Sequence, residues 1–298
     1  MIRRTLYGVI LLSVCASLAS AAAAAPVTPV PYVALGDSFS SGEGNGPFDG
    51  KCHRAQRADS AYPRLLPELV GYLAAPQFQA CTGATIADVW QRPQPRRGSQ
   101  LIQLEYLSPA TRLVTLTIGG NDLGFEEIVK RCLLPGDCSK SKLADKVSAG
   151  LQTIKASLTA VYTRVRDRMD PDGQLVVAGY PHLFISGPKA GCKLFISSGE
   201  AAWMNSLVNR GNTRITEAVR AARTLRGNVS YVDVTERFAG HGLCSEDPWL
   251  YGVNLAASDG LIKGSYHPRR SGQQAYAAAF AAFLRTAAIR TALARPAR

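Results

Sequence analysis

Four residues of this chain, far apart in the sequence, have the chemical types that a nucleophilic hydrolase needs. Ser38 offers a hydroxyl, and His267 offers a base that can take its proton. Gly83 and Asn121 can supply hydrogen-bond donors to an oxyanion, together with the backbone N–H of Ser38. Glycine lets the backbone approach a ligand without a Cβ, and an asparagine amide donates without losing a proton. The four residues together indicate covalent catalysis by a serine.

Three of these residues follow short stretches that are predicted to be strands. The stretches are Tyr32–Leu35, Phe78–Cys81 and Leu113–Ile118. In open α/β sheets, clefts form outside the carboxyl ends of the strands. We therefore expect Ser38, Gly83 and Asn121 to converge at one edge of a sheet.

The elements that must position these residues alternate between strand and helix. Further strands are predicted at Gln174–Ala178 and Val229–Val234. Helices are predicted at Ala61–Leu73, Leu143–Met169, Glu200–Leu225 and Ser271–Thr291. The pattern in Leu143–Met169 is the strongest, because apolar residues recur there every three or four positions. The alternation predicts a three-layer α/β/α fold of the flavodoxin-like type, with a mainly parallel central sheet.

The first 25 residues have the pattern of an export signal. Arg3 and Arg4 precede the apolar run Leu6–Leu18, and the small residues Ala19–Ala25 offer cleavage sites. The alternative is a membrane anchor, for which the apolar run is too short to span comfortably. We expect a secreted protein in which residues 26–298 form a single domain, since no linker divides them.

The cysteines agree with export. Of seven cysteines, Cys15 lies in the predicted signal and an even number remains. Pairing of neighbours along the sequence is the simplest arrangement, although the sequence alone leaves other pairings open. It gives Cys52–Cys81, Cys132–Cys138 and Cys192–Cys244. Zinc binding is the competing reading, but no Cys-x-x-Cys occurs, and we expect no metal and no organic cofactor.

Charge and motifs exclude several other classes of protein. The formal net charge is +12 at pH 7, which favours anionic lipid or polymer surfaces. No long run of like charge occurs and aromatic residues do not interleave with basic ones, so nucleic acid is not expected as a partner. The absence of Gly-x-Ser-x-Gly and of His-Glu-x-x-His argues against an ordinary α/β-hydrolase and a metalloprotease.

Other polar residues near these segments have simpler interpretations. Asp37 is expected to stabilise the turn and helix start at Ser38, and Asp122 to orient the Asn121 loop. His53 is expected to lie at the surface or to contact a substrate. His182 is expected to pack in a loop, with a place in the lining of the cleft as the alternative, and His241 to lie in an exposed loop. Only His267 precedes a proline and the last predicted helix.

The chain resembles the SGNH (GDSL-type) hydrolase family. The residues that carry the resemblance are Gly36-Asp37-Ser38, Gly83, Gly119-Gly120-Asn121-Asp122 and His267, in the order of the family's four blocks. The resemblance covers nearly all of the predicted mature chain. The cysteines resemble those of the secreted bacterial lipase and esterase branch, and this implies three disulfides between sequential neighbours.

One position departs from the family pattern. Members often carry aspartate three residues before the histidine, and Gly264 stands there. By the same resemblance, esterases that lack the aspartate use a backbone carbonyl. We therefore expect a Ser38–His267 dyad in which the Gly264 carbonyl accepts from His267 Nδ1–H and fixes the ring. Asp259, the nearest upstream carboxylate, is the alternative.

The resemblance implies that the chain hydrolyses carboxylic esters through an acyl-enzyme on Ser38. Triacylglycerols and simple acyl esters are the expected substrates, and phospholipids and acetylated polysaccharides are the alternatives. The protein is expected to act as a monomer on a small-molecule or lipid ester, either in solution or at a lipid interface. A secreted binding protein that uses the same cleft without turnover is the rival hypothesis.

Overall fold

The computed structural model describes residues 28–93, 101–186, 196–253 and 264–295. Five parallel strands form its central sheet in the order β4-β1-β5-β6-β7. Their bounds are β1 Tyr32–Gly36, β4 Gln77–Phe78, β5 Leu113–Thr117, β6 Gln174–Ala178 and β7 Val229–Val232. A small antiparallel pair, β2 (Phe48–Asp49) and β3 (Arg54–Ala55), lies outside this sheet.

The central strands are buried on both faces, and their ends are aligned. Every residue of β1, β5 and β6 is buried, as expected for a parallel sheet that is covered by helices on each side. The register pairs Tyr32 with Leu113 and Gly36 with Thr117. Because β1 and β5 end together, the residues that follow them emerge at the same edge of the sheet.

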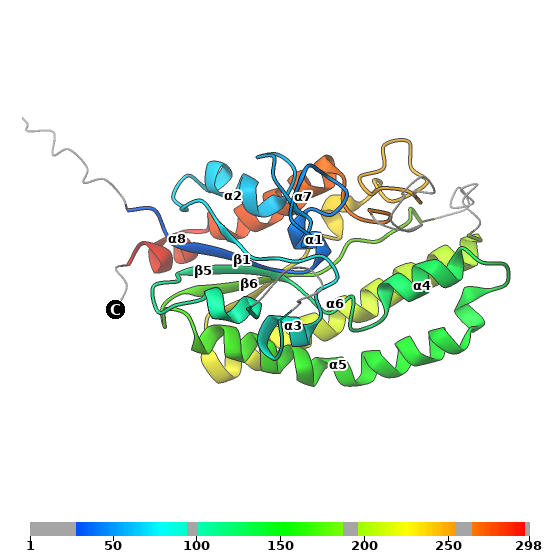
Figure 1. The fold of residues 1–298 in the computed structure, drawn as a ribbon, viewed down its shortest axis with the longest axis horizontal. Coiled ribbons are helices and arrows are strands. Elements are labelled where there is room, and N and C mark those ends of the chain that lie inside the picture. The colour runs from blue at the N-terminus through cyan, green and yellow to red at the C-terminus, as the bar shows by residue number, and fades with distance from the viewer. Residues whose placement is uncertain (1–27, 94–100, 187–195, 254–263, 296–298) are drawn as a thin grey trace, which may run out of the picture.

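Helices cover the two faces of the sheet in separate layers (Figure 1). One layer contains α2 (Tyr62–Val70) and α7 (Arg270–Leu284), which pack together. The other contains α3 (Ile86–Trp90) and the long pair α5 (Lys142–Asp167) and α6 (Ser198–Arg226). The predicted three-layer α/β/α fold is thus confirmed.

The two long helices follow directly from their sequences. Most apolar positions of α5 that were predicted from periodicity are buried, among them Leu151, Leu158 and Val165, and Leu143 in the first turn is half-buried. Its N-cap is Ser141, whose side chain accepts from the N–H of Ala144. The helix α6 begins with a capping box of Ser197 and Glu200, which satisfies otherwise unpaired N–H groups of its first turn.

The prediction was wrong at the end of the chain, where one helix was expected over Ser271–Thr291. The structure has α7 and a separate α8 (Ala287–Ala294), bent by 79° from each other. Thr286 is the N-cap of α8 and takes an extended conformation. Its backbone carbonyl accepts from Arg290 N–H. The alanine-rich pattern indicates burial but carries no information about this bend. In the described part of the chain, no single helix is long and apolar enough to cross a membrane.

Two more local features differ from the prediction. The strand expected at Phe78–Cys81 is the shorter β4, because the N–H groups of Gln79 and Ala80 both bond to the carbonyl of Ala34 and interrupt the regular ladder. No helix is predicted from the sequence at Phe125–Cys132, where the structure has α4. Its first turn carries acidic residues and its last turn basic ones, which suits the helix dipole.

Two disulfides pair neighbouring cysteines as predicted. Cys52 joins Cys81, and Cys132 joins Cys138. The first bond ties the loop after β2 to the segment that follows β4, two residues before Gly83. Cys192 and residues 1–25 lie outside the described residues, so the third pairing and the signal peptide stay predictions.

Candidate active site

The turn after β1 presents Ser38 at the edge of the sheet. Gly36 has φ +130°, and a Cβ there would lie 2.6 Å from both Ser40 Oγ and the Thr117 carbonyl, so only glycine fits. Asp37 caps the short helix α1 (Ser38–Ser41), because its side chain accepts from Phe39 N–H at 3.0 Å. Ser38 is therefore the first residue of a helix, where the helix dipole favours negative charge.

His267 lies directly beside this serine, although 229 positions separate them. Its Nε2 is 2.7 Å from Ser38 Oγ, and its Nδ1 is 2.8 Å from the carbonyl oxygen of Ser265. A carbonyl can only accept, so Nδ1 carries the proton and Nε2 is free to accept from the serine hydroxyl. This is the tautomer that a general base requires.

The residue that orients the ring differs from the predicted one. The carbonyl of Gly264 accepts instead from the backbone N–H of His267 at 3.3 Å. Gly264 and Tyr266 both have left-handed φ values, +81° and +62°, and this tight turn aims the next carbonyl, that of Ser265, at the imidazole. The expected type of acceptor is present, one residue later in the chain. Asp259 lies outside the described residues.

The electrostatics of His267 suit a base at neutral pH. Burial lowers the pKa of His267 below its ordinary value, whereas the charge of Glu43 and the bond to Ser265 partly oppose this shift. The Phe39 ring packs against the imidazole, with ring centroids 5.2 Å apart. The lowered pKa favours the neutral form of the ring, and the packing of Phe39 holds it beside the serine.

The loops that follow β4 and β5 are joined to each other. Asn121 Nδ2 donates to the carbonyl of Ala84 at 2.8 Å, and the carboxylate of Asp122 accepts from Ile86 N–H at 3.0 Å. The amide of Asn121 carries a second N–H beyond this bond. Gly83, with φ +75°, stands next to Ala84. The predicted donors Gly83 and Asn121 therefore lie on two loops that are fixed together.

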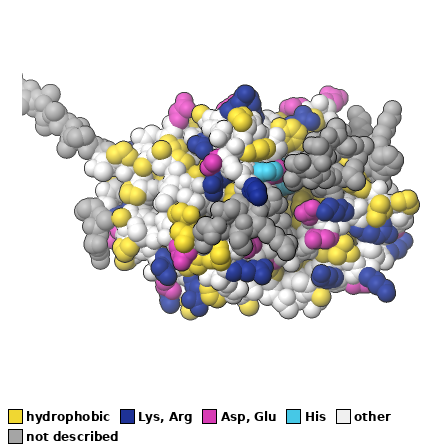
Figure 2. Space-filling view, viewed as in Figure 1, with side chains coloured by type: hydrophobic (Ala, Val, Ile, Leu, Met, Phe, Trp, Pro, Cys, Tyr) yellow, Lys and Arg dark blue, Asp and Glu magenta, His cyan; other side chains and the backbone are white. Residues whose placement is uncertain are grey.

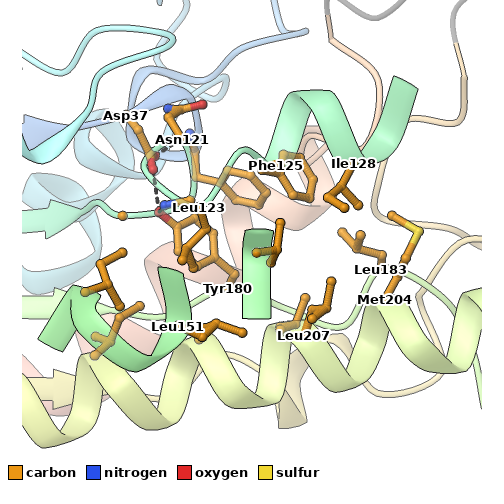
Figure 3. Close-up of a pocket in the computed structure, with 18 of the residues that line it drawn as sticks. Asp37, Asn121, Leu123, Phe125, Ile128, Leu151, Tyr180, Leu183, Met204 and Leu207 are labelled. Atoms are coloured by element: carbon orange, nitrogen blue, oxygen red, sulfur yellow. Dashed lines mark hydrogen bonds between the residues drawn. The ribbon is translucent and has the colours of Figure 1, made fainter. Parts of the chain in front are cut away.

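Tyr180, which the sequence analysis did not single out, connects the serine turn to the Asn121 loop. Its hydroxyl donates to Asp37 Oδ2 at 2.5 Å and accepts from the N–H of Gly120 at 3.2 Å (Figure 3). Burial raises the pKa of Asp37 to about 6, and the bonds from Tyr180 and Thr117 limit this rise. The only sequence signal for Tyr180 is its place just after a strand.

An apolar pocket opens beside Ser38 and extends between α4, α5 and α6 (Figure 3). Asp37 and Asn121 stand at one end, and Ile128, Leu183 and Met204 stand at the other. Such a pocket can hold a hydrocarbon chain next to the serine.

The remaining histidines bind neighbouring side chains. His53 Nδ1 lies 2.8 Å from Glu43, His182 Nε2 lies 2.6 Å from Asn209, and His241 stacks on Trp249. Among the described residues, no group of three or more His, Cys, Asp or Glu is placed to hold a metal ion.

A serine hydroxyl and a histidine ring in contact at the carboxyl edge of a parallel sheet form the arrangement of a serine hydrolase. The chain belongs to the GDSL-like lipase/acylhydrolase family, whose model matches residues 34–275. That range includes Ser38, Gly83, Asn121 and His267. The protein is a carboxylic ester hydrolase, and its substrates are esters.

Curated relatives and solved structures agree with this assignment. The chain is 36% identical to a lipase of Streptomyces rimosus and 34% identical to lipase 1 of Streptomyces coelicolor, over 86% of this chain and 87% of the relative in each case. It is similar to phospholipase A1 from Streptomyces albidoflavus (TM-score 0.72, 32% identity, 86% of this chain and 99% of the other). It is also similar to an extracellular lipase from Streptomyces rimosus (TM-score 0.69, 33% identity, 85% and 99%).

Proposed function

We propose that the protein is a secreted lipase or esterase that cleaves acyl-lipid esters through an acyl-enzyme on Ser38. The observation that carries this proposal is the 2.7 Å distance between His267 Nε2 and Ser38 Oγ. The distance is within the range that direct proton transfer from a nucleophile to its base requires.

The proposed reaction has two halves. His267 Nε2 takes the proton of Ser38 as Oγ attacks the ester carbonyl, and the resulting oxyanion is bound by Ser38 N–H, Gly83 N–H and the Asn121 amide. His267 then gives the proton to the leaving alcohol, and the acyl group stays on Ser38. Water attacks this acyl-enzyme with His267 again as base, which releases the carboxylic acid and restores the serine.

The apolar pocket supports an acyl chain as the group that stays on the enzyme. Its lining between α4, α5 and α6 consists largely of aliphatic and aromatic side chains. A hydrocarbon chain gains from such burial at about 0.8 kcal/mol per CH₂ group, whereas an acetyl group on a polysaccharide leaves most of the pocket empty. Acyl lipids are therefore favoured over acetylated polysaccharide.

Phospholipid is the second candidate substrate, and two observations support it. A similar solved structure is a phospholipase A1, and this chain has a net charge of +12. Basic and acidic side chains are scattered over the face in Figure 2, so the positive charge is not gathered in one patch there. The net positive charge therefore favours attraction of the whole protein to an anionic lipid interface, rather than binding through one basic patch.

Export and a monomeric state complete the proposal. Support for export comes from the pattern of residues 1–25, from two disulfides and from the extracellular lipase among the similar structures. We expect removal of the signal to yield an active monomer, which size-exclusion chromatography with light scattering will test.

A panel of esters tests the function. Chromogenic esters of increasing acyl length, a triacylglycerol, a phosphatidylcholine and acetylated xylan are assayed with wild type and Ser38→Ala. We expect hydrolysis that favours acyl chains longer than acetyl and that falls by at least about a thousandfold in the variant. Equal rates for wild type and Ser38→Ala would contradict the role of Ser38, and the absence of hydrolysis of every ester would contradict the proposal and favour a binding protein.

A further inference from the structure

The buried carboxylate of Glu43 takes no part in the proton transfer between Ser38 and His267. Glu43 follows α1 in the chain and is 4% exposed. Its N–H donates to the carbonyl of Ser38 at 3.1 Å. Its side-chain Oε2 lies 2.8 Å from His53 Nδ1, and the His53 ring stacks on Phe48. The carboxylate is therefore held in one position, on the segment that carries the nucleophile.

The loop of Glu43 packs against the turn of His267. A Cβ on Gly264 would lie 3.3 Å from Gly44 Cα, so the two backbones are in close contact. Asn45 Nδ2 donates to the carbonyl of Pro268 at 2.8 Å. The residues that follow Glu43 thus contact the chain on both sides of His267, and the loop that carries Glu43 packs against the turn that carries the imidazole.

We propose that Glu43 is a positioning residue that supplies, through space, the negative charge that a carboxylate on Nδ1 supplies in a catalytic triad. The imidazole becomes a cation as Ser38 attacks, and the Ser265 carbonyl orients the ring without offering a full charge. A buried charge is screened less by salt and water than an exposed one. In this proposal the Ser265 carbonyl fixes the orientation of the His267 ring, and the Glu43 carboxylate stabilises the imidazolium.

The balance of charges around His267 supports this role. Among the groups that oppose the effect of burial on the pKa of His267, Glu43 acts most strongly. The Ser265 and Gly264 carbonyls and Glu126 also raise this pKa. The carboxylate of Glu126 is 58% exposed and pairs with Lys130, so solvent weakens its influence. His53 is the titratable group that faces Glu43 directly.

The test is Glu43→Gln, which keeps the shape and a hydrogen bond to His53 but removes the charge. Loss of a negative charge favours neutral imidazole, so the acid limb of kcat/KM moves to lower pH. The plateau value of kcat falls about three- to tenfold because the imidazolium is less stabilised, while KM changes by less than about twofold. Glu126→Gln is the matched control, and we expect its profile to stay that of wild type. Glu43→Asp keeps the charge and should keep the limb in place.

The proposal rests on the Ser38–His267 reaction, and the two fail in distinguishable ways. If Ser38→Ala is inactive while the acid limb of the kcat/KM profile of folded Glu43→Gln stays at the pH of wild type, only the role of Glu43 is refuted. If Glu43→Gln lowers only the melting temperature, Glu43 has a structural role through its pairing with His53, and the proposal is refuted. An equal shift of the acid limb in Glu126→Gln would also refute it. Glu43→Met provides a second uncharged variant if the glutamine variant does not fold. In either variant, an NMR titration of the His267 ring reads its pKa without any substrate.

Discussion

At the scale of single residues, the turn from Gly264 to His267 determines how the imidazole of His267 is oriented. Two residues of this turn have left-handed backbone conformations, which cost energy for any residue other than glycine. At Gly264 a side chain would also meet Gly44, on the loop that follows the nucleophile. The position therefore needs glycine both for its backbone conformation and for the contact between the two catalytic segments.

Gly264→Ala should weaken both stability and turnover. The matched control is Gly240→Ala, because Gly240 also has φ +81° but a Cβ there meets nothing within 4 Å. We expect Gly240→Ala to cost about 1–2 kcal/mol of unfolding free energy with kcat unchanged. Gly264→Ala should cost at least about 1 kcal/mol more and lower kcat about tenfold or more. Urea unfolding and ester hydrolysis measure the two effects, and similar results for both variants would argue against the contact.

At the scale of elements, the helices α5 and α6 form the wall of the pocket. Gly211 lies in α6 and lines the pocket, and a Cβ there would enter open space. A larger side chain at this position can fill the pocket without displacing backbone.

Gly211→Leu should shorten the acyl chain that the enzyme prefers. Rates for long-chain esters should fall about tenfold or more relative to short-chain esters, because the leucine occupies the space of several methylene groups. Gly211→Ala is the control, since it gains helix stability by roughly 0.5–1 kcal/mol while it adds only a methyl group. An unchanged chain-length profile in the leucine variant would show that the acyl chain lies elsewhere.

The sequence predicted those elements whose own pattern determines them. Strands β5 and β6 and helices α5 and α6 were recognised because burial on both faces or on one helical face leaves a repeating pattern. The bend between α7 and α8 was not predicted, because it depends on the conformation of Thr286.

The same distinction holds for the candidate site. Ser38 and His267 could be named because their blocks carry a motif, and the structure brings them into contact. The choice of the Ser265 carbonyl depends on the left-handed conformations of the two residues that flank it, Gly264 and Tyr266. The link through Tyr180 and the place of Glu43 depend on how distant loops meet. No local pattern in the sequence records such contacts.

At the scale of the whole molecule, the two disulfides should differ in what they contribute. Cys52 and Cys81 are 29 positions apart, and Cys132 and Cys138 are 6 apart. The longer loop loses more entropy on closure of the unfolded chain, by about 1.5RT times the logarithm of the length ratio, or roughly 1 kcal/mol.

Removal of Cys52 and Cys81 as a pair should therefore destabilise the protein by about 1 kcal/mol more than removal of Cys132 and Cys138. It should also lower kcat, because Cys81 anchors the loop of Gly83. Double serine variants, compared by urea unfolding and by turnover, measure both effects. Equal stability losses would show that native-state contacts, rather than loop length, dominate.

The most direct measurement is the detection of the acyl group on the enzyme during turnover. Wild type is mixed rapidly with a chromogenic long-chain ester and quenched in acid, and its peptides are mapped by mass spectrometry. The account predicts one added acyl group on the peptide that contains Ser38, which is absent in Ser38→Ala and greatly reduced in His267→Ala. An acyl group on another residue, or steady turnover with Ser38 never modified, would contradict it.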